Sequence, residues 1–209
     1  GEERPPPKRG QDRWIRWGCP EAWTPGEYST SVYPENWQYR ISVERDANGG
    51  VVSNYIQDTL KVGDKVGVSA PAGSFTYKET KSEPVLLLAG GIGITPLVLI
   101  AEVALKDGRN VELYYSNDHS RPFTQWFKSI KNQYGDKFKL KEFISHGEVE
   151  KIDELYNQRI TPKDIPDTKK FDTYVLGPDR YMDMVFNELK SRGVDASEIL
   201  TETFGVYRT

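Results

Sequence analysis

The stretch Pro84-Val-Leu-Leu-Leu-Ala-Gly-Gly-Ile-Gly-Ile-Thr-Pro96 decides the fold of this protein. Its apolar run after Pro84 is too short for a helix and is closed by Gly90, so it predicts a buried strand. A second apolar run, Leu97-Val-Leu-Ile-Ala-Glu-Val-Ala-Leu105, follows at once and predicts a helix. The sequence therefore places a strand, a glycine-rich turn and a helix in direct succession.

The turn between the strand and the helix carries Gly90, Gly91 and Gly93, and their missing side chains allow the backbone to approach a ligand closely. Thr95 suits the N-cap of the helix, and Pro96 suits its first position, where a missing N–H costs nothing. A helix N-terminus directs free N–H groups and a partial positive charge at one point, which suits a pyrophosphate. Because the spacing is not G-x-G-x-x-G, a tight strand-to-helix turn without a ligand is an equal alternative.

The composition is that of a globular protein, with 209 residues of which 37% are hydrophobic and 28% charged. A net charge of −3 gives no argument for binding nucleic acid or a bilayer. No apolar run approaches the roughly 20 residues of a membrane span. Cys19 is the only cysteine and His119 and His146 are far apart in sequence, so no disulfide within the chain and no metal site are predicted. No secretory signal is recognised, and a cytoplasmic location is expected.

The second half of the chain alternates between strands and helices, which predicts right-handed crossovers and a parallel sheet with helices on both faces. Ligands of such sheets bind at the carboxyl ends of the strands. The expected strands are 85–89, 111–115, 138–144, 171–176 and 198–204. The expected helices are 96–106, 122–134 and 179–192, with a short one near 150–157.

The first half shows β patterns. Tyr39-Arg-Ile-Ser-Val43 alternates, and Lys61–Ser69 is a turn that leads into a strand, so we expect a small antiparallel barrel, either complete or incomplete. Residues 1–25 are rich in Pro and Trp and are expected to be an irregular arm, packed on the domain or on a partner, or offering tryptophans to a ligand. The expected domains are thus the arm 1–25, a β domain 26–80 and an α/β domain 81–209.

Short pieces of the sequence, in this order, resemble the ferredoxin–NADP reductase superfamily, and most of all the FAD/NAD(P)-binding reductase part of flavohaemoglobins (nitric oxide dioxygenases). They are Glu27-Tyr-Ser-Thr-Ser31, Tyr39-Arg-Ile-Ser-Val-Glu-Arg45, Gly49-Gly-Val-Val-Ser-Asn-Tyr55, Val62-Gly-Asp64, Ala70-Pro-Ala-Gly-Ser-Phe75, Ala89 to Pro96, Leu176-Gly-Pro178 and Glu202-Thr-Phe-Gly205. The resemblance implies that 26–80 binds flavin and 81–209 binds NAD(P).

The resemblance also implies roles for matching positions. Residues implied at the flavin ring, and thereby in catalysis, are Tyr28, Ser29 and Glu202, with the Phe204 ring covering the flavin. Residues implied at the FAD pyrophosphate are Gly50, Val51, Val52 and Ser53. Residues implied at the NAD(P) are Gly90, Gly91, Gly93, Thr95, Gly177 and Pro178.

Each role has a plain structural alternative. Tyr28 would be an ordinary tyrosine, Ser53 a helix cap, Glu202 a solvated charge at a strand end and Phe204 a core residue. The order of the motifs favours the functional interpretation for Tyr28, Ser29, Ser53 and Thr95.

The sequence departs from the family pattern at several positions. Gly26 stands where the family usually has an arginine that pairs with a flavin phosphate. Loss of that contact, worth roughly 1.5–3 kcal/mol, would weaken FAD binding. The arginines that could replace it are Arg13, Arg16, Arg40 and Arg45. The barrel segment before Tyr28 is shorter than the family's, Leu176 replaces a frequent cysteine, and Gln57 stands where flavohaemoglobins tend to carry histidine.

The choice between NADH and NADPH is open from sequence. After the second nucleotide-domain strand, Asp118 could repel a 2′-phosphate whereas Arg121 could bind one. The balance leans slightly toward NADH.

The resulting hypothesis is an FAD-dependent NAD(P)H oxidoreductase that passes electrons to a one-electron acceptor. That acceptor would be a haem or iron–sulfur protein, an upstream domain, or a small molecule. The alternative is a non-catalytic nucleotide-binding or interaction module that kept the reductase fold and lost tight flavin binding. A nucleotide-binding protein unrelated to flavin would explain only the second half.

Overall fold

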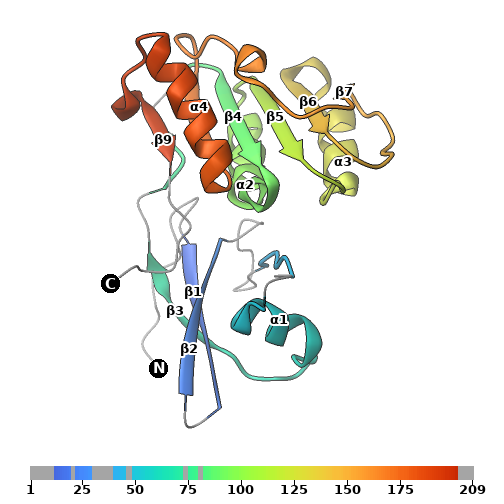
Figure 1. Ribbon diagram of the computed structural model, residues 1–209, viewed down its shortest axis with the longest axis vertical. Coiled ribbons are helices and arrows are strands. Elements are labelled where there is room, and N and C mark those ends of the chain that lie inside the picture. The colour runs from blue at the N-terminus through green and yellow to red at the C-terminus, as the bar shows by residue number, and fades with distance from the viewer. Residues whose placement is uncertain are drawn as a thin grey trace. The chain divides into compact units, whose positions relative to one another are not determined.

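The computed structural model describes residues 12–19, 22–29, 40–45, 49–72, 75–79 and 82–201. The chain divides into two compact units, Gly1–Tyr77 and Lys78–Thr209. The described strands of the first unit form an antiparallel sheet and those of the second a parallel sheet (Figure 1).

The N-terminal unit contains a β-hairpin. β1 (Asp12–Cys19) and β2 (Ala22–Ser29) pair antiparallel, and β3 (Gly67–Ala72) joins the other side of β1. The expectation of an irregular arm over 1–25 is therefore wrong for the residues of these strands. Aromatic and β-branched residues favour extended backbone, and the continuous pairing of β1 with β2 outweighs the proline and charge content behind the expectation.

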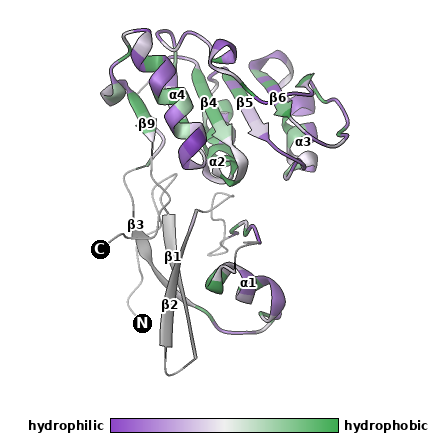
Figure 2. Ribbon diagram, in the orientation of Figure 1, coloured by the Kyte–Doolittle hydropathy of each residue, from purple (hydrophilic) through white to green (hydrophobic). Residues whose placement is uncertain are grey.

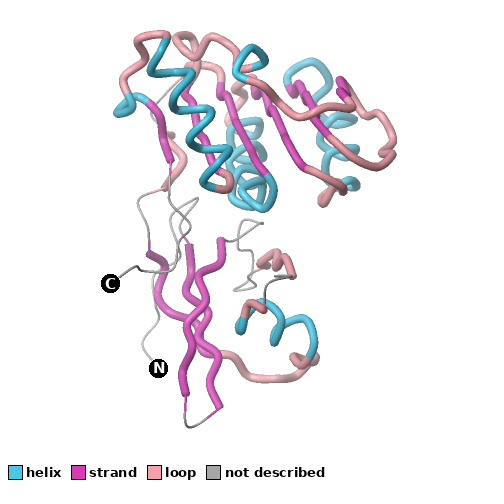
Figure 3. Tube along the Cα trace, viewed as in Figure 1, coloured by secondary structure: helices cyan, strands magenta, loops and turns pink. Residues whose placement is uncertain are grey.

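The described strands of this unit make one three-stranded sheet, so the small barrel stays a prediction. The segment expected to be a strand at 39–43 contributes, among its described residues, a single bridge at Ile41. One helix, α1 (Val51–Asp58), accompanies the strands (Figure 3). Gln57 Nε2 donates to the Val43 carbonyl oxygen at 2.7 Å, which ties the irregular segment to α1.

The described strands of the second unit form a parallel sheet, as predicted. The sheet has six strands rather than the five expected, in the order β7-β6-β5-β4-β8-β9. Its strands are β4 (Val85–Gly90), β5 (Val111–Asn117), β6 (Phe138–Ile144), β7 (Glu154–Tyr156), β8 (Asp172–Leu176) and β9 (Ile199–Thr201). The chain runs outward from β4 to β7 and then returns to the other side of β4 with β8. The topological switch point, where α/β sheets bind their ligands, therefore lies between β4 and β8.

Three α-helices connect these strands, and their bounds agree with the predicted ones to within two residues. They are α2 (Ile94–Lys106), α3 (Thr124–Tyr134) and α4 (Asp179–Ser191). Short 3₁₀ helices are η1 (Gly91–Gly93), η2 (Gly135–Lys137), η3 (Pro162–Asp164) and η4 (Ala196–Glu198).

The helix expected near 150–157 is wrong, because this segment contains strand β7. β7 pairs with β6, and the Tyr156 ring stacks on Phe143 with centroids 5.0 Å apart. A neighbouring strand thus overrides the local helix preference of the segment.

Helices cover both faces of the parallel sheet (Figure 1), α4 on one face and α2 and α3 on the other. Leu86 and Leu88 share a core cluster with Leu189 of α4, whereas Tyr115 packs near Phe127 of α3 with ring centroids 6.2 Å apart. All of β4 is buried, and β4 and α2 are the most hydrophobic parts of the unit (Figure 2). A strand covered on both faces explains why its sequence is a continuous apolar run rather than an alternating one.

A buried ion pair fixes the start of this unit to the sheet. Arg109 Nη2 lies 3.3 Å from Asp172 Oδ2, with the two side chains 5% and 0% exposed. The Arg109 guanidinium also donates to the carbonyl oxygens of Glu83 and Lys78. The Lys78 N–H donates to the Tyr174 hydroxyl at 3.0 Å, so the polar segment from residue 78 is anchored at both of its described parts.

Candidate functional site

The predicted NAD(P) residues of the two loops lie together at the carboxyl ends of β4 and β8. β4 pairs with β8 so that Ala89 is opposite Leu176, and each strand continues directly into its loop. The structure therefore brings the loop 90–93 beside the loop 177–178. The first loop leads into α2 and the second into α4.

The glycines of these loops are needed for packing within the protein itself. A Cβ atom added at Gly93 would lie 2.5 Å from the Leu176 carbonyl oxygen. A Cβ atom at Gly90 or Gly177 would lie 2.7 or 2.6 Å from ring carbons of Tyr181. These contacts are far shorter than van der Waals contact. An alanine at Gly93 would push the backbones of the two loops apart, and an alanine at Gly90 or Gly177 would displace the Tyr181 ring.

Tyr181 is the residue that the sequence analysis missed at this site. Its ring fills the space that Gly90 and Gly177 leave open, and its hydroxyl is buried with no hydrogen-bond partner among the described residues. Burial raises the pKa of Tyr181 above its usual value. The signal in the sequence was an aromatic residue in the first turn after Gly177-Pro178.

Two helix N-termini meet this edge of the sheet. α4 begins after Pro178. The Tyr181 N–H donates to the Pro178 carbonyl oxygen at 2.9 Å and is the first N–H of the helix to find an acceptor one turn back. The N–H groups of Asp179 and Arg180 precede it and have no acceptor one turn back within the helix. α2 begins at the same edge, so two partial positive charges and free N–H groups suit an anion such as a pyrophosphate.

Thr95 does not cap α2, contrary to the sequence expectation. The helix begins at Ile94 with Gly93 as its N-cap, and η1 precedes it without a break. The Thr95 hydroxyl is buried and donates to the Ile92 carbonyl oxygen instead. The exposed side chain of this loop is Ile92, which is 38% exposed and gives the edge an apolar component.

The predicted flavin residues that the structure describes lie on β2 and α1 of the N-terminal unit, and these two elements contact each other. Tyr28 and Ser29 end β2, and Tyr28 is half-buried, which raises its pKa. Gly50 is the N-cap of α1 and Ser53 its third residue, so Gly50–Ser53 form the first turn of the helix. The predicted site residues Glu202 and Phe204 lie outside the described residues.

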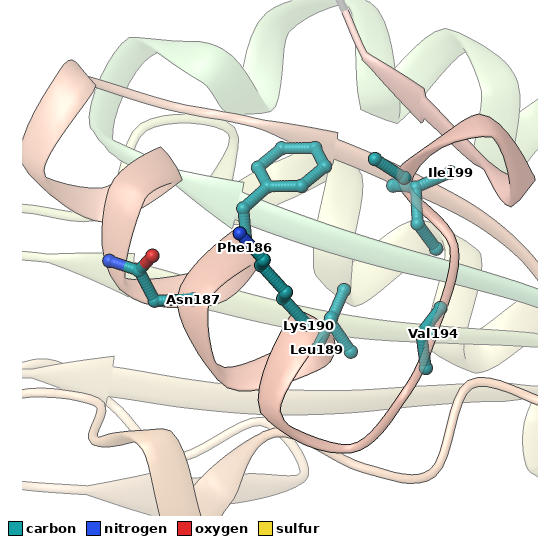
Figure 4. A pocket seen from close by; sticks show the side chains of 7 residues that line it. Phe186, Asn187, Leu189, Lys190, Val194 and Ile199 are labelled. Atoms are coloured by element: carbon teal, nitrogen blue, oxygen red, sulfur yellow. The ribbon is translucent and has the colours of Figure 1, made fainter.

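An apolar cavity of about 310 Å³ lies elsewhere in the second unit, between α4, η4 and β9 (Figure 4). Its walls include Phe186, Leu189, Val194 and Ile199, and no predicted site residue lines it. None of the helices in the described ranges is long and apolar enough to cross a membrane. No three His, Cys, Asp or Glu side chains in those ranges gather where a metal could bind.

Comparison with known proteins shows which proteins this chain is similar to. Residues 87–186 match the family described as the oxidoreductase NAD-binding domain. The chain is 49% identical over 181 residues to a flavohemoprotein of Schizosaccharomyces pombe, covering 81% of this chain and 42% of that protein. It resembles the solved flavohem-like FAD/NAD-binding domain of a nitric oxide dioxygenase from Vibrio cholerae O1 biovar El Tor with a TM-score of 0.83 and 28% identity, covering 97% of this chain and 87% of that one. The chain belongs to the ferredoxin–NADP reductase superfamily.

This chain spans about half the length of the curated relatives that it matches. A flavohemoprotein of Candida albicans is 39% identical over 212 residues, covering 97% of this chain and 52% of that protein. The prediction of the superfamily, and of the likeness to the reductase part of flavohaemoglobins, is confirmed.

One of the arginines considered as a replacement for the family arginine at Gly26 is paired elsewhere. Arg45 pairs with Asp58, Nη1 to Oδ1 at 2.5 Å and Nη2 to Oδ2 at 3.0 Å. Asp58 is the last residue of α1, so the Arg45 charge is held at the opposite end of the helix from Gly50–Ser53. Arg13, by contrast, occupies the register position opposite Tyr28 on the neighbouring strand.

Arg121 is likewise unavailable to a ligand. Its Nε and Nη2 donate to both carboxylate oxygens of Glu142 at 2.6 and 2.8 Å, and the two side chains are 2% and 0% exposed. Nη2 also donates to the Glu150 carbonyl oxygen. The guanidinium therefore fastens the segment after β6 to the sheet instead of facing solvent.

Proposed function

We propose that this chain is an FAD-dependent NAD(P)H oxidoreductase that transfers electrons to a one-electron acceptor. The observation that carries the proposal is the paired loops at the carboxyl ends of β4 and β8, where two helix N-termini converge. Such an edge suits a dinucleotide pyrophosphate. Bound FAD would supply the exchange between a two-electron hydride and single electrons.

The protein's own residues would bind and orient the two cofactors. The close-packed glycines would hold the two NAD(P) loops at a fixed separation, and the exposed Ile92 would offer an apolar contact to a ring. In the N-terminal unit, the first turn of α1 fits a phosphate, because Gly50 adds no side chain and Ser53 adds a hydroxyl. Tyr28 and Ser29 on the adjacent strand would meet the flavin ring.

The acceptor is proposed to be a haem protein or haem domain. The support is the name flavohemoprotein carried by relatives from Schizosaccharomyces pombe and Candida albicans, which extend well beyond the part matched by this chain. The test is electron transfer from the NADH-reduced chain to a globin haem under anaerobic conditions.

The proposed activity itself is tested by the absorption spectrum of the purified chain. We expect the flavin band at about 450 nm to bleach when NADH is added without oxygen. A colourless protein that FAD cannot reconstitute would contradict the proposal and favour a module that does not bind flavin.

The assignment of the flavin residues is tested by substitution within one helix. Ser53→Ala removes a hydroxyl from the first turn of α1, and we expect FAD affinity to fall about tenfold, the effect of one hydrogen bond to a charged group. Tyr28→Ala should also lower FAD occupancy. Thr59→Ala, at the C-cap of the same helix, is the matched control and should leave FAD affinity unchanged. If Ser53→Ala and Tyr28→Ala bind FAD as tightly as the control Thr59→Ala, the assignment of the flavin residues is contradicted.

A further inference from the structure

The two histidines of the chain, His119 and His146, lie next to each other although they are far apart in the sequence. β5 and β6 pair in parallel with Asn117 opposite Ile144, and each histidine stands two residues beyond its member of that pair. The centroids of the two imidazole rings are 5.0 Å apart, and the ring planes are inclined by 33°. The fold therefore forms a histidine pair just beyond two neighbouring strands.

The backbone of the two turns holds this pair in place. The His146 N–H donates to the Asp118 carbonyl oxygen at 2.7 Å. The main chain at Gly147 packs against the first turn, and a Cβ atom added there would lie 3.1 Å from the His119 carbonyl oxygen. Because these contacts join the two main chains, the two imidazoles are neighbours before any ligand binds.

A hydrogen-bond network assigns the proton of the His146 ring. Ser145 Oγ donates to Asp118 Oδ1 at 3.0 Å, since an ionised carboxylate can only accept. The same hydroxyl oxygen lies 3.1 Å from His146 Nδ1, so it accepts the hydrogen bond of the Nδ1–H group. The lone pair of the ring is then on Nε2. Histidines that bind metals are oriented in this way, by donating the other ring N–H to a neighbouring acceptor.

We propose that His119 and His146 form an exchangeable site for a divalent transition-metal cation such as zinc. Two imidazoles bound to one tetrahedral zinc, at Zn–N distances of about 2.0–2.1 Å, have ring centroids roughly 5 Å apart, as in this pair. Imidazole nitrogen suits zinc, whereas magnesium and calcium require oxygen ligands. Both histidines are exposed, so a cation can reach them from solvent.

The remaining coordination positions would be filled by water. In the part of the chain that the structure describes, no third His, Cys, Asp or Glu side chain joins the pair, and a zinc site with open positions exchanges its water. Asp118 would act through Ser145 and not as a ligand, with Arg159 Nη2 3.5 Å from its Oδ1 atom. A bound cation would link the turn after β5 to the turn after β6.

The test is a zinc titration of the full chain, purified without a histidine tag and followed by NMR of the imidazole rings. The sequence has only two histidines, so His119→Gln and His146→Gln assign both ring signals. We expect zinc to shift the two signals along one binding curve, and magnesium at the same concentration to shift neither. Each of the two variants should lose this binding, because a single exposed imidazole remains.

A matched pair of serine variants tests the orientation of the His146 ring. Ser145→Ala removes the acceptor of the Nδ1–H group, and we expect zinc affinity to fall about tenfold. Ser191→Ala removes an exposed hydroxyl at the end of α4 and should leave zinc affinity unchanged. An unchanged affinity in Ser145→Ala would overturn the role of this serine in the site.

Three results would overturn the metal site itself. The first is that zinc shifts neither ring signal of the unmodified chain. The second is that the two signals shift with different affinities, which would mean that the histidines act separately. The third is that His119→Gln or His146→Gln keeps the zinc affinity of the unmodified chain.

Discussion

The ring of Tyr181 packs against two loops that are far apart in the sequence. It occupies the space above Gly90 and Gly177, and both positions exclude a Cβ atom because of it. Its hydroxyl is buried without a hydrogen-bond partner among the described residues, so no hydrogen bond compensates for the loss of hydration. Tyr174 is the opposite case, since its buried hydroxyl donates to Asp172 Oδ2 at 3.1 Å and accepts from the Lys78 N–H.

These two tyrosines predict opposite effects for the same substitution. Tyr181→Phe removes an unpaired buried hydroxyl, and we expect the free energy of unfolding to rise by about 1 kcal/mol. Tyr174→Phe leaves Asp172 and Lys78 without their hydroxyl partner, and we expect a loss of about 1–2 kcal/mol. Urea denaturation followed by circular dichroism measures both. A loss of stability in Tyr181→Phe would show that the hydroxyl has a partner.

At the scale of elements, the segment between β6 and β7 is held by α3 and by the edge of the sheet. Lys128 of α3 pairs with Glu150 at 2.5 Å, and Lys131 donates to Asp153 at 2.8 Å. Asp153 also accepts the Leu140 N–H of β6 at 2.9 Å. These contacts place the segment so that β7 can pair with β6.

We expect the Asp153 carboxylate to make the free energy of unfolding depend on pH. Burial alone would raise the pKa of Asp153, but the Leu140 N–H and the Lys131 ammonium outweigh it and hold the pKa below its usual value. A carboxylate with a lowered folded-state pKa stabilises the fold above its unfolded pKa of about 4, and that stabilisation is lost as the pH falls through the folded pKa.

We therefore expect Asp153→Asn to lower the free energy of unfolding by about 1–2 kcal/mol at pH 7, and the difference from the unmodified chain to shrink below about pH 4. Urea titrations at several pH values measure it. Asp136→Asn, at an exposed position of the same unit, should change the free energy of unfolding at pH 7 by less than about 0.5 kcal/mol. A difference for Asp153→Asn that stays constant down to pH 3 would contradict the assignment.

At the scale of the whole molecule, the second unit has the features of an independent folding domain. Its parallel sheet is covered on both faces by its own helices. Its buried Arg109 has partners within the unit at Asp172 and at the carbonyl oxygens of Lys78 and Glu83. Lys78 and Glu83, which precede the first strand of the sheet, therefore make contacts with the interior of this unit.

A fragment of residues 78–209 should fold and unfold cooperatively by itself. A fragment of residues 84–209 removes two carbonyl acceptors from Arg109 and the N–H that Tyr174 accepts, so we expect it to be less stable by about 2–3 kcal/mol. Thermal denaturation compares the two. Equal melting temperatures would mean that the contacts of Lys78 and Glu83 contribute nothing to the domain.

The alternation of apolar runs with glycine and proline was sufficient to predict the α/β unit from the sequence. The continuous run of β4, the glycine turn and the amphipathic α4 are local patterns, and local patterns follow from the periods of helix and strand. The resemblance to the family implied that the loops 90–93 and 177–178 both serve NAD(P), and the general rule that parallel sheets bind ligands at the carboxyl ends of their strands agrees with it. The same family motifs implied the flavin roles on β2 and α1, which stay a prediction.

The sequence by itself determined five of the described strands and the three α-helices of this unit, the parallel sheet and the edge at which a nucleotide would bind. Only the tertiary structure decided that Arg121 belongs to Glu142, that 154–156 is a strand, and that Tyr181 needs Gly90 and Gly177. The physical reason is distance along the chain. Periodicity reports how a residue relates to its neighbours within a turn or a strand, whereas a buried charge pair or a filled gap depends on residues that only the completed fold brings together.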